Sequence, residues 1–299
     1  METESVEEGF RGRLSSLYYN ILKPILANRR ATVGLFILLG FILMATIGPI
    51  LVPLDLTMRW SERFKPPSLE HPLGTDYAGR DIFQQIVHGS RDVLTIAFLA
   101  ALFAIAIAVT IGTLSGYLGG IVDYVLMGVT DIFLTIPQFP VMLMIAATIK
   151  VSDPISFSAI IAIWMWAGLA RAIRAEIISL RQKDFIEAAN VLDLGTGHIV
   201  FKELMPNILP YIVINFVTMM RVAITASVGI MFLGVVPLSI THWGVMLNMA
   251  MFAYGAIYVP NGIHYALAPL MFIVLLEYGA VNLAHGLDEV FNPRLRRYE

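Results

Sequence analysis

Long stretches without Asp, Glu, Lys or Arg are the feature that most limits how this chain can fold. Residues 31–53, 93–118 and 222–276 contain none of these four residue types. A helix needs about 20 predominantly apolar residues to cross the hydrocarbon core of a bilayer. The chain as a whole is 14% charged, whereas soluble domains carry about 25% charged residues. The sequence therefore predicts an all-α membrane protein in a lipid bilayer.

We expect six transmembrane helices, because apolar segments of spanning length recur along the chain. They cover residues 31–53, 93–118, 124–149, 154–170, 207–236 and 263–284. The third of them is interrupted by Asp131, Pro137 and Pro140. Two further segments are expected at the membrane surface: an amphipathic helix at 82–88 and a surface or re-entrant helix at 243–258. The expected organisation is an N-terminal segment 1–30, a first transmembrane helix 31–53, a loop 54–91 that carries the surface helix, a five-helix core 92–286 and a tail 287–299.

The distribution of basic residues orients these helices. Five lie in residues 1–30, five in 171–203 and three in 287–299. The opposite side carries six, mostly in 54–91, and so long a loop counts for little in the positive-inside rule. The bias of thirteen against six predicts a multi-pass plasma-membrane protein with both termini in the cytoplasm. Residues 171–206 are then cytoplasmic, and 54–91 and 237–262 are extracytoplasmic.

A charged, helix-forming stretch at 187–206 lies within the expected cytoplasmic loop 176–206. It consists of two short pieces, each with an apolar stripe and charges on its other faces. We expect a sharp chain reversal between them at Gly195-Thr196-Gly197, because glycine frees the backbone there. Pro206 then opens the fifth helix, where early positions tolerate proline. The stretch is either an ordinary loop or a docking element for a soluble partner.

Three charged residues lie inside or beside the expected spans: Asp131, Arg221 and Glu277. Charges within a membrane are costly, so they usually pair or mark a functional site. Two interpretations remain open. Arg221 forms an ion pair with Glu277 or Asp131 that holds helices together, or one of the three lines a solute path. Asn215 and Asn282 are expected to donate hydrogen bonds between helices.

Several classes of chemistry find no support in the sequence. It has no Gly-x-x-x-x-Gly-Lys-Ser/Thr phosphate loop and no cysteine, and its six histidines show no metal-ligand spacing. The net charge of −2 gives no broad basic surface for nucleic acid. We therefore expect no enzyme active site, no metal site and no cofactor on this chain.

Several motifs together resemble one family of transport proteins. Nearly the whole chain is similar to the second, C-type permease subunit of dipeptide and oligopeptide ATP-binding-cassette importers, the type I class that depends on a binding protein. The motifs are Gly74-Thr75-Asp76 with Gly79-Arg80-Asp81, Glu187-Ala188-Ala189 with Pro206-Asn207, Phe232-Leu233-Gly234, Trp243-Gly244 and Asn292-Pro293-Arg294. The first of these is specific to the subunit type, and the second is general to the importer class.

The resemblance implies a type I permease fold of six transmembrane helices with a cytoplasmic coupling helix. It also implies four kinds of neighbour: a homologous permease subunit, two ATPase subunits that bind ATP and Mg, an extracellular solute-binding protein, and the lipid bilayer. The residues it assigns to ATPase coupling are Glu187, Ala188, Ala189, Asp193, Gly195 and Pro206.

Several positions depart from the family pattern. Val235-Val236 stand where Leu-Gly usually follows Phe-Leu-Gly, and the segment between Gly234 and Trp243 is about one residue short. Asp193 stands where the family usually has glycine, so we expect the turn to be shifted toward Gly195. Ser227 stands where an acidic residue is usual, which puts any role of that carboxylate in doubt.

The function expected from the resemblance is ATP-driven import of di- or oligopeptides, or of oligosaccharides. Nickel is the least favoured cargo, because no His or carboxylate cluster lines a span. The main alternative is a stand-alone secondary transporter or channel, which predicts internal repeats that the sequence does not display. A membrane scaffold is a third class, but it does not require so specific a cytoplasmic loop.

Overall fold

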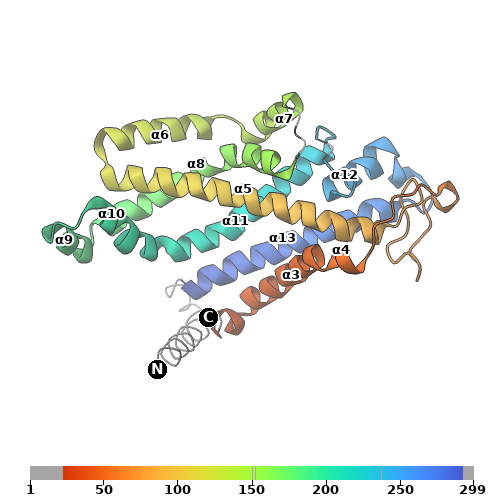
Figure 1. Cartoon of the computed structure of the whole chain (residues 1–299), viewed down its shortest axis with the longest axis horizontal. Coiled ribbons are helices and arrows are strands. Elements are labelled where there is room, and N and C mark those ends of the chain that lie inside the picture. The colour runs from red at the N-terminus through yellow and green to blue at the C-terminus, as the bar shows by residue number, and fades with distance from the viewer. Residues whose placement is uncertain (1–22, 150, 152, 237, 292–299) are drawn as a thin grey trace, which may run out of the picture.

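Long helices that run lengthwise form the body of the molecule in this computed structural model (Figure 1). The structure describes residues 23–149, 151, 153–236 and 238–291. The first part of the expected N-terminal segment, residues 1–22, and the Asn292-Pro293-Arg294 motif lie outside these ranges. The long helices are α3 (Arg29–Thr46), α5 (Ile82–Leu118), α6 (Gly120–Thr135), α8 (Pro154–Arg181), α11 (Met205–Phe232) and α13 (Ile263–Phe291). In the described part of the chain there is no β-strand, only an isolated bridge between Thr75 and Asp81.

Shorter helices connect these long ones. They are α2 (Lys23–Ala27), α4 (Gly48–Leu51), η2 (Trp60–Glu62), α7 (Gln138–Thr148), α9 (Asp184–Val191), α10 (Thr196–His198), η3 (Ile199–Leu204), α12 (Trp243–Asn248), η4 (Met249–Ala253) and η5 (Ala256–Tyr258). Five helical segments are long and apolar enough to cross a membrane, and a bent pair gives a sixth. This all-α architecture is the fold class expected from the sequence.

The bent pair is the expected third span, in which α6 and α7 meet at an angle of 83°. The break lies at Pro137. The residue before a proline is pushed out of the helical region, and Ile136 is extended, with φ −81° and ψ 129°. Pro140, the other expected interruption, lies inside α7. The third span is therefore two separate helices rather than one kinked helix.

The expected surface helix at 82–88 does not exist as a separate element. Helix α5 runs without a break from Ile82 to Leu118. Asp81 caps it by accepting a hydrogen bond from the Gln84 backbone N–H. The prediction was wrong: Arg91 and Asp92 lie between the expected surface helix and the expected span, and these charged residues do not interrupt helical hydrogen bonding.

Small residues let α5 and α8 pack closely at the centre of the bundle. A Cβ atom on Gly112 would lie 2.6 Å from the Ala170 carbonyl oxygen, and one on Gly116 would lie 2.8 Å from that of Arg174. Close backbone approach at small residues is the usual way in which membrane helices associate. This pair forms the core around which the other helices are arranged.

The first helix packs against a helix far away in sequence. A Cβ atom on Gly34 in α3 would lie 2.3 Å from the Leu283 nitrogen in α13, and one on Gly286 would lie 2.3 Å from the Ala31 nitrogen. Glu289 adds polar contacts, since it accepts from Asn28 Nδ2 at 2.6 Å and from Arg30 Nη1 at 2.7 Å. Helices α3 and α13 are therefore held in backbone contact along much of their length.

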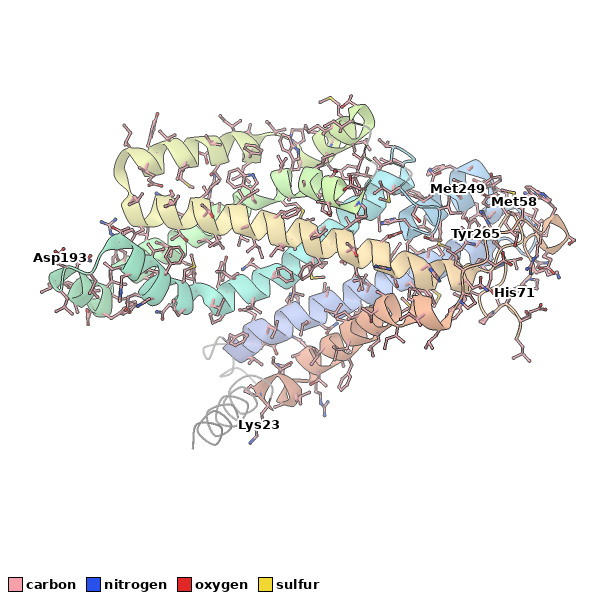
Figure 2. All side chains as sticks on the ribbon, viewed as in Figure 1. Lys23, Met58, His71, Asp193, Met249 and Tyr265 are labelled. Atoms are coloured by element: carbon pink, nitrogen blue, oxygen red, sulfur yellow. The ribbon has the colours of Figure 1, made fainter. Side chains whose placement is uncertain are left out.

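The two ends of the bundle carry different segments (Figures 1 and 2). Helices α9 and α10 lie at one end, which we call the α9 end, and Asp193 is at its tip. The connection 53–81 and the segment that contains α12 lie at the other end, the α12 end, where His71 and Met249 are labelled. The connection 53–81 and the described residues of 238–262, all expected to be extracytoplasmic, thus lie at the end opposite to the 187–206 loop.

A buried ion pair organises the connection at the α12 end. Asp76 accepts hydrogen bonds from Arg80 Nε at 2.8 Å and from the backbone N–H groups of Ala78 and Arg80. The ring of Tyr77 stacks on that of Tyr254, with centroids 3.5 Å apart. Gly79 has φ +77°, and a Cβ there would lie 2.0 Å from the Arg59 carbonyl oxygen. The Gly-Thr-Asp-x-x-Gly-Arg-Asp motif therefore builds a closed loop that the sequence alone did not explain.

Candidate functional site

The 187–206 stretch projects beyond the bundle between α8 and α11 (Figure 1). Helix α9 follows α8 after a two-residue break, and α10 and η3 lead directly into α11. Thr196–Phe232 forms one continuous helical segment of 37 residues, about 55 Å long at 1.5 Å per residue. We call residues 184–204, which contain α9, α10 and η3, the tip. The tip is thus attached to two of the longest helices in the molecule.

The apolar side chains of this tip divide into two sets. The inward set is buried in the main core together with Ile177 of α8, and consists of Ile186, Ala189, Ile199 and Leu204. The outward set points away from the helix bundle and consists of Phe185, Val191, Leu192 and Phe201. Val191 is 81% exposed, Leu192 and Phe201 are each 72% exposed, and Phe185 is 40% exposed. Burial of the first set fixes the tip on the spans, and exposure of the second leaves an apolar surface that no other described residue covers.

The structure separates the residues of Glu187-Ala188-Ala189. Glu187 and Ala188 are exposed. The Glu187 backbone N–H donates to the Lys183 carbonyl at 3.2 Å, but no ion pair or side-chain hydrogen bond joins the Glu187 carboxylate to Lys183. Ala189 is 4% exposed and belongs to the inward set. The resemblance assigns both alanines to ATPase coupling; the Ala189 side chain packs inside the chain, so it is not available for a direct contact with another protein.

The chain reversal occurs before Gly195. Helix α9 ends at Val191, and Asp193 takes the left-handed conformation with φ +53°. Gly195 has an ordinary φ of −57°, and Gly197 lies within α10. The expected shift of the turn toward Gly195 is therefore wrong. Asp193 itself adopts the backbone that normally favours glycine, and Asp is one of the few residues that tolerate it.

A π-helical turn joins the tip to α11. In η3 the Met205 N–H donates to the Val200 carbonyl, five residues back instead of four. Pro206 follows in the first turn of α11, as expected. Proline has no N–H and its ring displaces the carbonyl four residues before it, which accounts for the altered hydrogen bonding here.

Two of the three intramembrane charges lie together. Arg221 Nη1 is 3.8 Å from Glu277 Oε2, and Thr225 Oγ1 donates to Glu277 Oε1 at 2.7 Å. Asp131 does not join them; it pairs with Arg171 across α6 and α8. The proposed pairing of Arg221 with Asp131 is therefore wrong, because Asp131 faces a different helix.

Neighbouring polar contacts differ from expectation as well. Arg174 of α8 binds Asp123 of α6 through two 2.5 Å hydrogen bonds, a second α6–α8 ion pair. Asn215 and Asn282 each donate to the carbonyl four residues earlier in their own helix. The expected hydrogen bonds between helices through these two asparagines are absent among the described residues.

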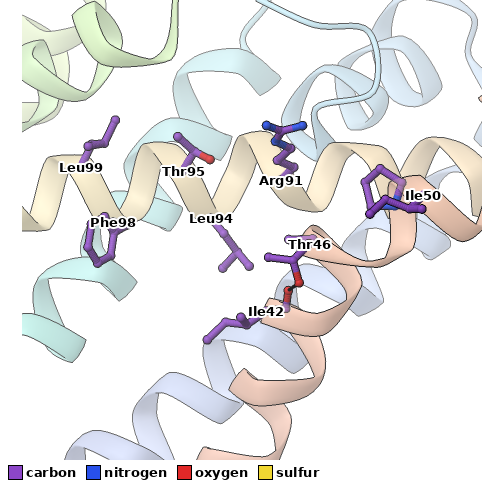
Figure 3. A pocket seen from close by; sticks show the side chains of 10 residues that line it. Ile42, Thr46, Ile50, Arg91, Leu94, Thr95, Phe98 and Leu99 are labelled. Atoms are coloured by element: carbon purple, nitrogen blue, oxygen red, sulfur yellow. Dashed lines mark hydrogen bonds between the residues drawn. The ribbon is translucent and has the colours of Figure 1, made fainter.

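A groove of about 550 Å³ extends from the Glu277 carboxylate between α11 and α13. Its walls are apolar apart from Thr225 and Glu277, and include Val228, Phe232, Leu247, Met251, Ile263, Leu267 and Leu270. A second groove lies between α3 and α5, where Ile42 and Thr46 face Leu94 and Phe98 (Figure 3). Sequence reasoning identified Glu277 but missed the walls, since apolar residues in a span give no sign of whether they face lipid, protein or a cavity.

The described residues form no candidate metal site, and one buried histidine among them is uncharged. No group of three or more His, Asp or Glu among them could hold a metal ion. Burial lowers the pKa of His242 to about 3, so this histidine is neutral in the folded protein. It caps α12 through Nδ1, which accepts from the Gly244 N–H.

Known proteins resemble this chain over most of its length. Residues 108–297 match the family described as "Binding-protein-dependent transport system inner membrane component", and residues 16–67 match the "N-terminal TM domain of oligopeptide transport permease C". The dipeptide transport system permease protein DppC of Bacillus subtilis is 31% identical over 90% of this chain and 83% of its own length. The oligopeptide transport system permease protein OppC of the same organism is 30% identical over 94% and 91%.

Proposed function

Because this chain belongs to the family of binding-protein-dependent transport system inner membrane components, we propose that it is a permease subunit through which an ATP-driven importer carries di- and oligopeptides. Relatives named as dipeptide and oligopeptide permeases favour peptides over oligosaccharides as cargo. The observation that carries the proposal is the tip at the α9 end, which presents Val191, Leu192 and Phe201 outward. An exposed apolar surface of this kind is typical of a site that another protein covers.

The complex that this function requires has four kinds of component. We propose that a homologous second permease completes the membrane path and that two ATPase subunits bind ATP and Mg. An extracellular solute-binding protein delivers the peptide. This chain supplies half of the path and no ATP site, so the energy reaches it through the tip.

The mechanism follows from how the tip is attached. The inward set fixes α9 and η3 on α8 and α11, so a displacement of the tip moves both helices. ATP-driven closure of the ATPases would push on the outward set and tilt α11, whose continuous segment reaches from Thr196 to Phe232. Tilting of such helices alternates access to the path between the two sides of the membrane.

We place the tip and both termini in the cytoplasm and residues 54–91 outside, as the basic residues indicate. The chain has no cysteine, so a Thr196→Cys variant gives a single labelling site at the tip. A membrane-impermeant maleimide should label it in inverted vesicles and not in intact cells. Labelling from outside alone would overturn this orientation.

The experiment that tests the function is reconstitution of the full complex in liposomes with its binding protein. We expect ATP-dependent uptake of a labelled peptide, and retention of peptide by the co-purified binding protein. Uptake of solute by this chain alone, without ATPases, would instead establish a stand-alone transporter. Retention of an oligosaccharide would contradict the peptide assignment.

A further inference from the structure

Two charged side chains, those of Glu277 and Arg221, lie near the middle of their helices on a face of the bundle that no other described helix covers. Glu277 is at the middle of α13, and Arg221 is near the middle of α11. Their side chains are 22% and 39% exposed, and Thr225 beside them is also exposed. Charged side chains inside membranes almost always face protein or a water-filled cavity rather than lipid. This face of α11 and α13 is therefore not a lipid-facing surface.

The groove between α11 and α13 connects this charged group to the α12 end. It begins at Ile263, the first residue of α13, and ends at Glu277. These residues are 14 positions apart, or about 21 Å along a helix. Thr225 and apolar residues of α11, α12, η4 and η5 form the rest of the wall. A solute that enters from the α12 end would thus meet apolar walls first and the carboxylate last.

The Glu277 carboxylate retains unused hydrogen-bonding capacity. A carboxylate has about four lone-pair sites, and Thr225 is the one hydrogen-bond donor that reaches it among the described residues. Arg221 Nη1, at 3.8 Å from Oε2, is close enough for charge attraction but too far for a hydrogen bond. Arg221 also lies one helical turn before Thr225, on the side toward the α9 end. The carboxylate can therefore accept a further donor from the groove.

We propose that this groove is the outer half of the solute path and that Glu277 binds the cationic ammonium group of a peptide in transit. The inference rests on the proposed function, since it assigns the peptide-binding group of that path. Apolar walls accommodate peptide side chains without selecting among them, and the carboxylate recognises the charge common to peptides with a free amino terminus. Thr225 orients the carboxylate, and Arg221 is a positioning residue on its inner side.

Access to the groove can be measured directly in this cysteine-free chain. Leu270→Cys places a thiol on an exposed position of the groove wall. Leu275→Cys is the control, because Leu275 is equally exposed but lies about 140° around the helix from Leu270 and does not line the groove. Both variants are studied in the full complex in liposomes, with the other subunits free of cysteine. The probes are a cationic and an anionic methanethiosulfonate that do not cross membranes.

We expect the thiol at position 270 to react and the one at 275 to remain unreactive, with the cationic probe favoured at 270. Glu277→Gln in the same background should reduce that preference by roughly three- to tenfold, as expected for loss of one nearby charge. If position 270 is unreactive with and without ATP, protein or lipid covers the groove and the proposal is wrong. If Glu277→Gln changes the reaction rates of the cationic and the anionic probe equally, Glu277 is not the charge that solutes meet in the groove.

Uptake provides a second measurement. The wild-type complex should prefer a dipeptide with a free amino terminus to its N-acetylated form, and Glu277→Gln should remove this preference while the ATPases still co-purify. An unchanged preference would overturn the role of Glu277 and leave the importer function intact. Absence of any peptide uptake by the wild type would instead contradict the proposed function, whatever the labelling shows.

Discussion

Asp76 Oδ2 lies 2.8 Å from Arg80 Nε in the connection between the first two spans, where both side chains are buried. The same carboxylate accepts from the Ala78 N–H at 2.8 Å and from Gln85 Nε2 at 3.1 Å. Four donors thus converge on Asp76, counting the Arg80 backbone N–H. This arrangement fixes the start of α5 relative to the connection.

Arg80→Ala should destabilise the complex markedly, because removing one partner of a buried ion pair costs about 3–5 kcal/mol. The measurement is the apparent Tm of the purified complex together with its yield. Arg59→Ala is the control, since Arg59 pairs with Asp55 at the surface of the same connection. A Tm for Arg80→Ala as high as that of the control would show that the pair does not stabilise the fold.

Leu192→Asp should uncouple the permease from its ATPases. Leu192 belongs to the outward set, and burying a leucine at an interface contributes about 1.5–3 kcal/mol. ATPase co-purification should therefore fall at least roughly tenfold while the permease still inserts. The same substitution at Leu69, an exposed leucine at the α12 end, serves as control. Wild-type ATPase association in Leu192→Asp would mean that the tip is not the docking surface.

Ala189→Asp would act differently from Ala188→Asp, although the two residues are adjacent. Ala189 is buried in the inward set and Ala188 is exposed. A carboxylate at 189 should lower the yield of folded permease, because an unpaired buried charge is strongly unfavourable. A carboxylate at 188 should leave the yield unchanged and reduce ATPase stimulation alone. Equal yields for the two variants, measured by size-exclusion chromatography, would contradict this division.

The sequence predicted the spans because the thickness of the bilayer sets the minimum length of an apolar helix that crosses it. It did not predict where α5 begins. It predicted an interruption of the third span at Pro137 but not that the span forms two separate helices there, since tertiary packing decides how a boundary signal is used. At the tip, the spacing of apolar residues identified the loop. The same spacing could not tell Ala189 from Leu192, because inward and outward faces depend on the helices against which α9 packs.

Asp193 offers a conformational test of the tip. Its φ of +53° costs a side-chain-bearing residue roughly 1 kcal/mol relative to glycine. Asp193→Gly should therefore preserve or slightly raise both stability and coupling, whereas Asp193→Val should lower them, because β-branched residues tolerate this backbone poorly. ATPase stimulation and Tm measure the two effects. Equal behaviour of the two variants would show that the left-handed turn is not needed.

His242 should make the complex less stable in mild acid. The folded-state pKa is about 3, and the unfolded-state pKa is about 6.5. Between these values the unfolded chain binds a proton that the folded chain does not, so stability is full above about pH 6.5 and falls by up to about 1.4 kcal/mol for each pH unit below it. His242→Asn retains a capping side chain. Its Tm should depend less on pH between 7 and 5, and an unchanged slope would exclude His242 as the titrating group.

Gly34→Ala should weaken the contact between α3 and α13. The added Cβ would lie 2.3 Å from the Leu283 nitrogen and 2.6 Å from the Gly279 carbonyl oxygen, so the helices must separate. Overpacking of this kind costs typically about 1–3 kcal/mol. Gly40→Ala in the same helix is the control, because nothing lies within 4 Å of its Cβ and alanine favours helix. A lower Tm for Gly40→Ala than for Gly34→Ala would contradict this packing.

The contact between α3 and α13 also sets an order of events during synthesis. Helix α3 ends at Thr46 and α13 begins at Ile263, so at 5–20 residues per second a ribosome needs roughly ten to forty seconds to pass from one to the other. Throughout that interval the glycine face of α3 has only lipid or the insertion machinery beside it. During synthesis the first helix can pair with α5 early, but its glycine face stays without its partner helix until α13 has been translated and inserted.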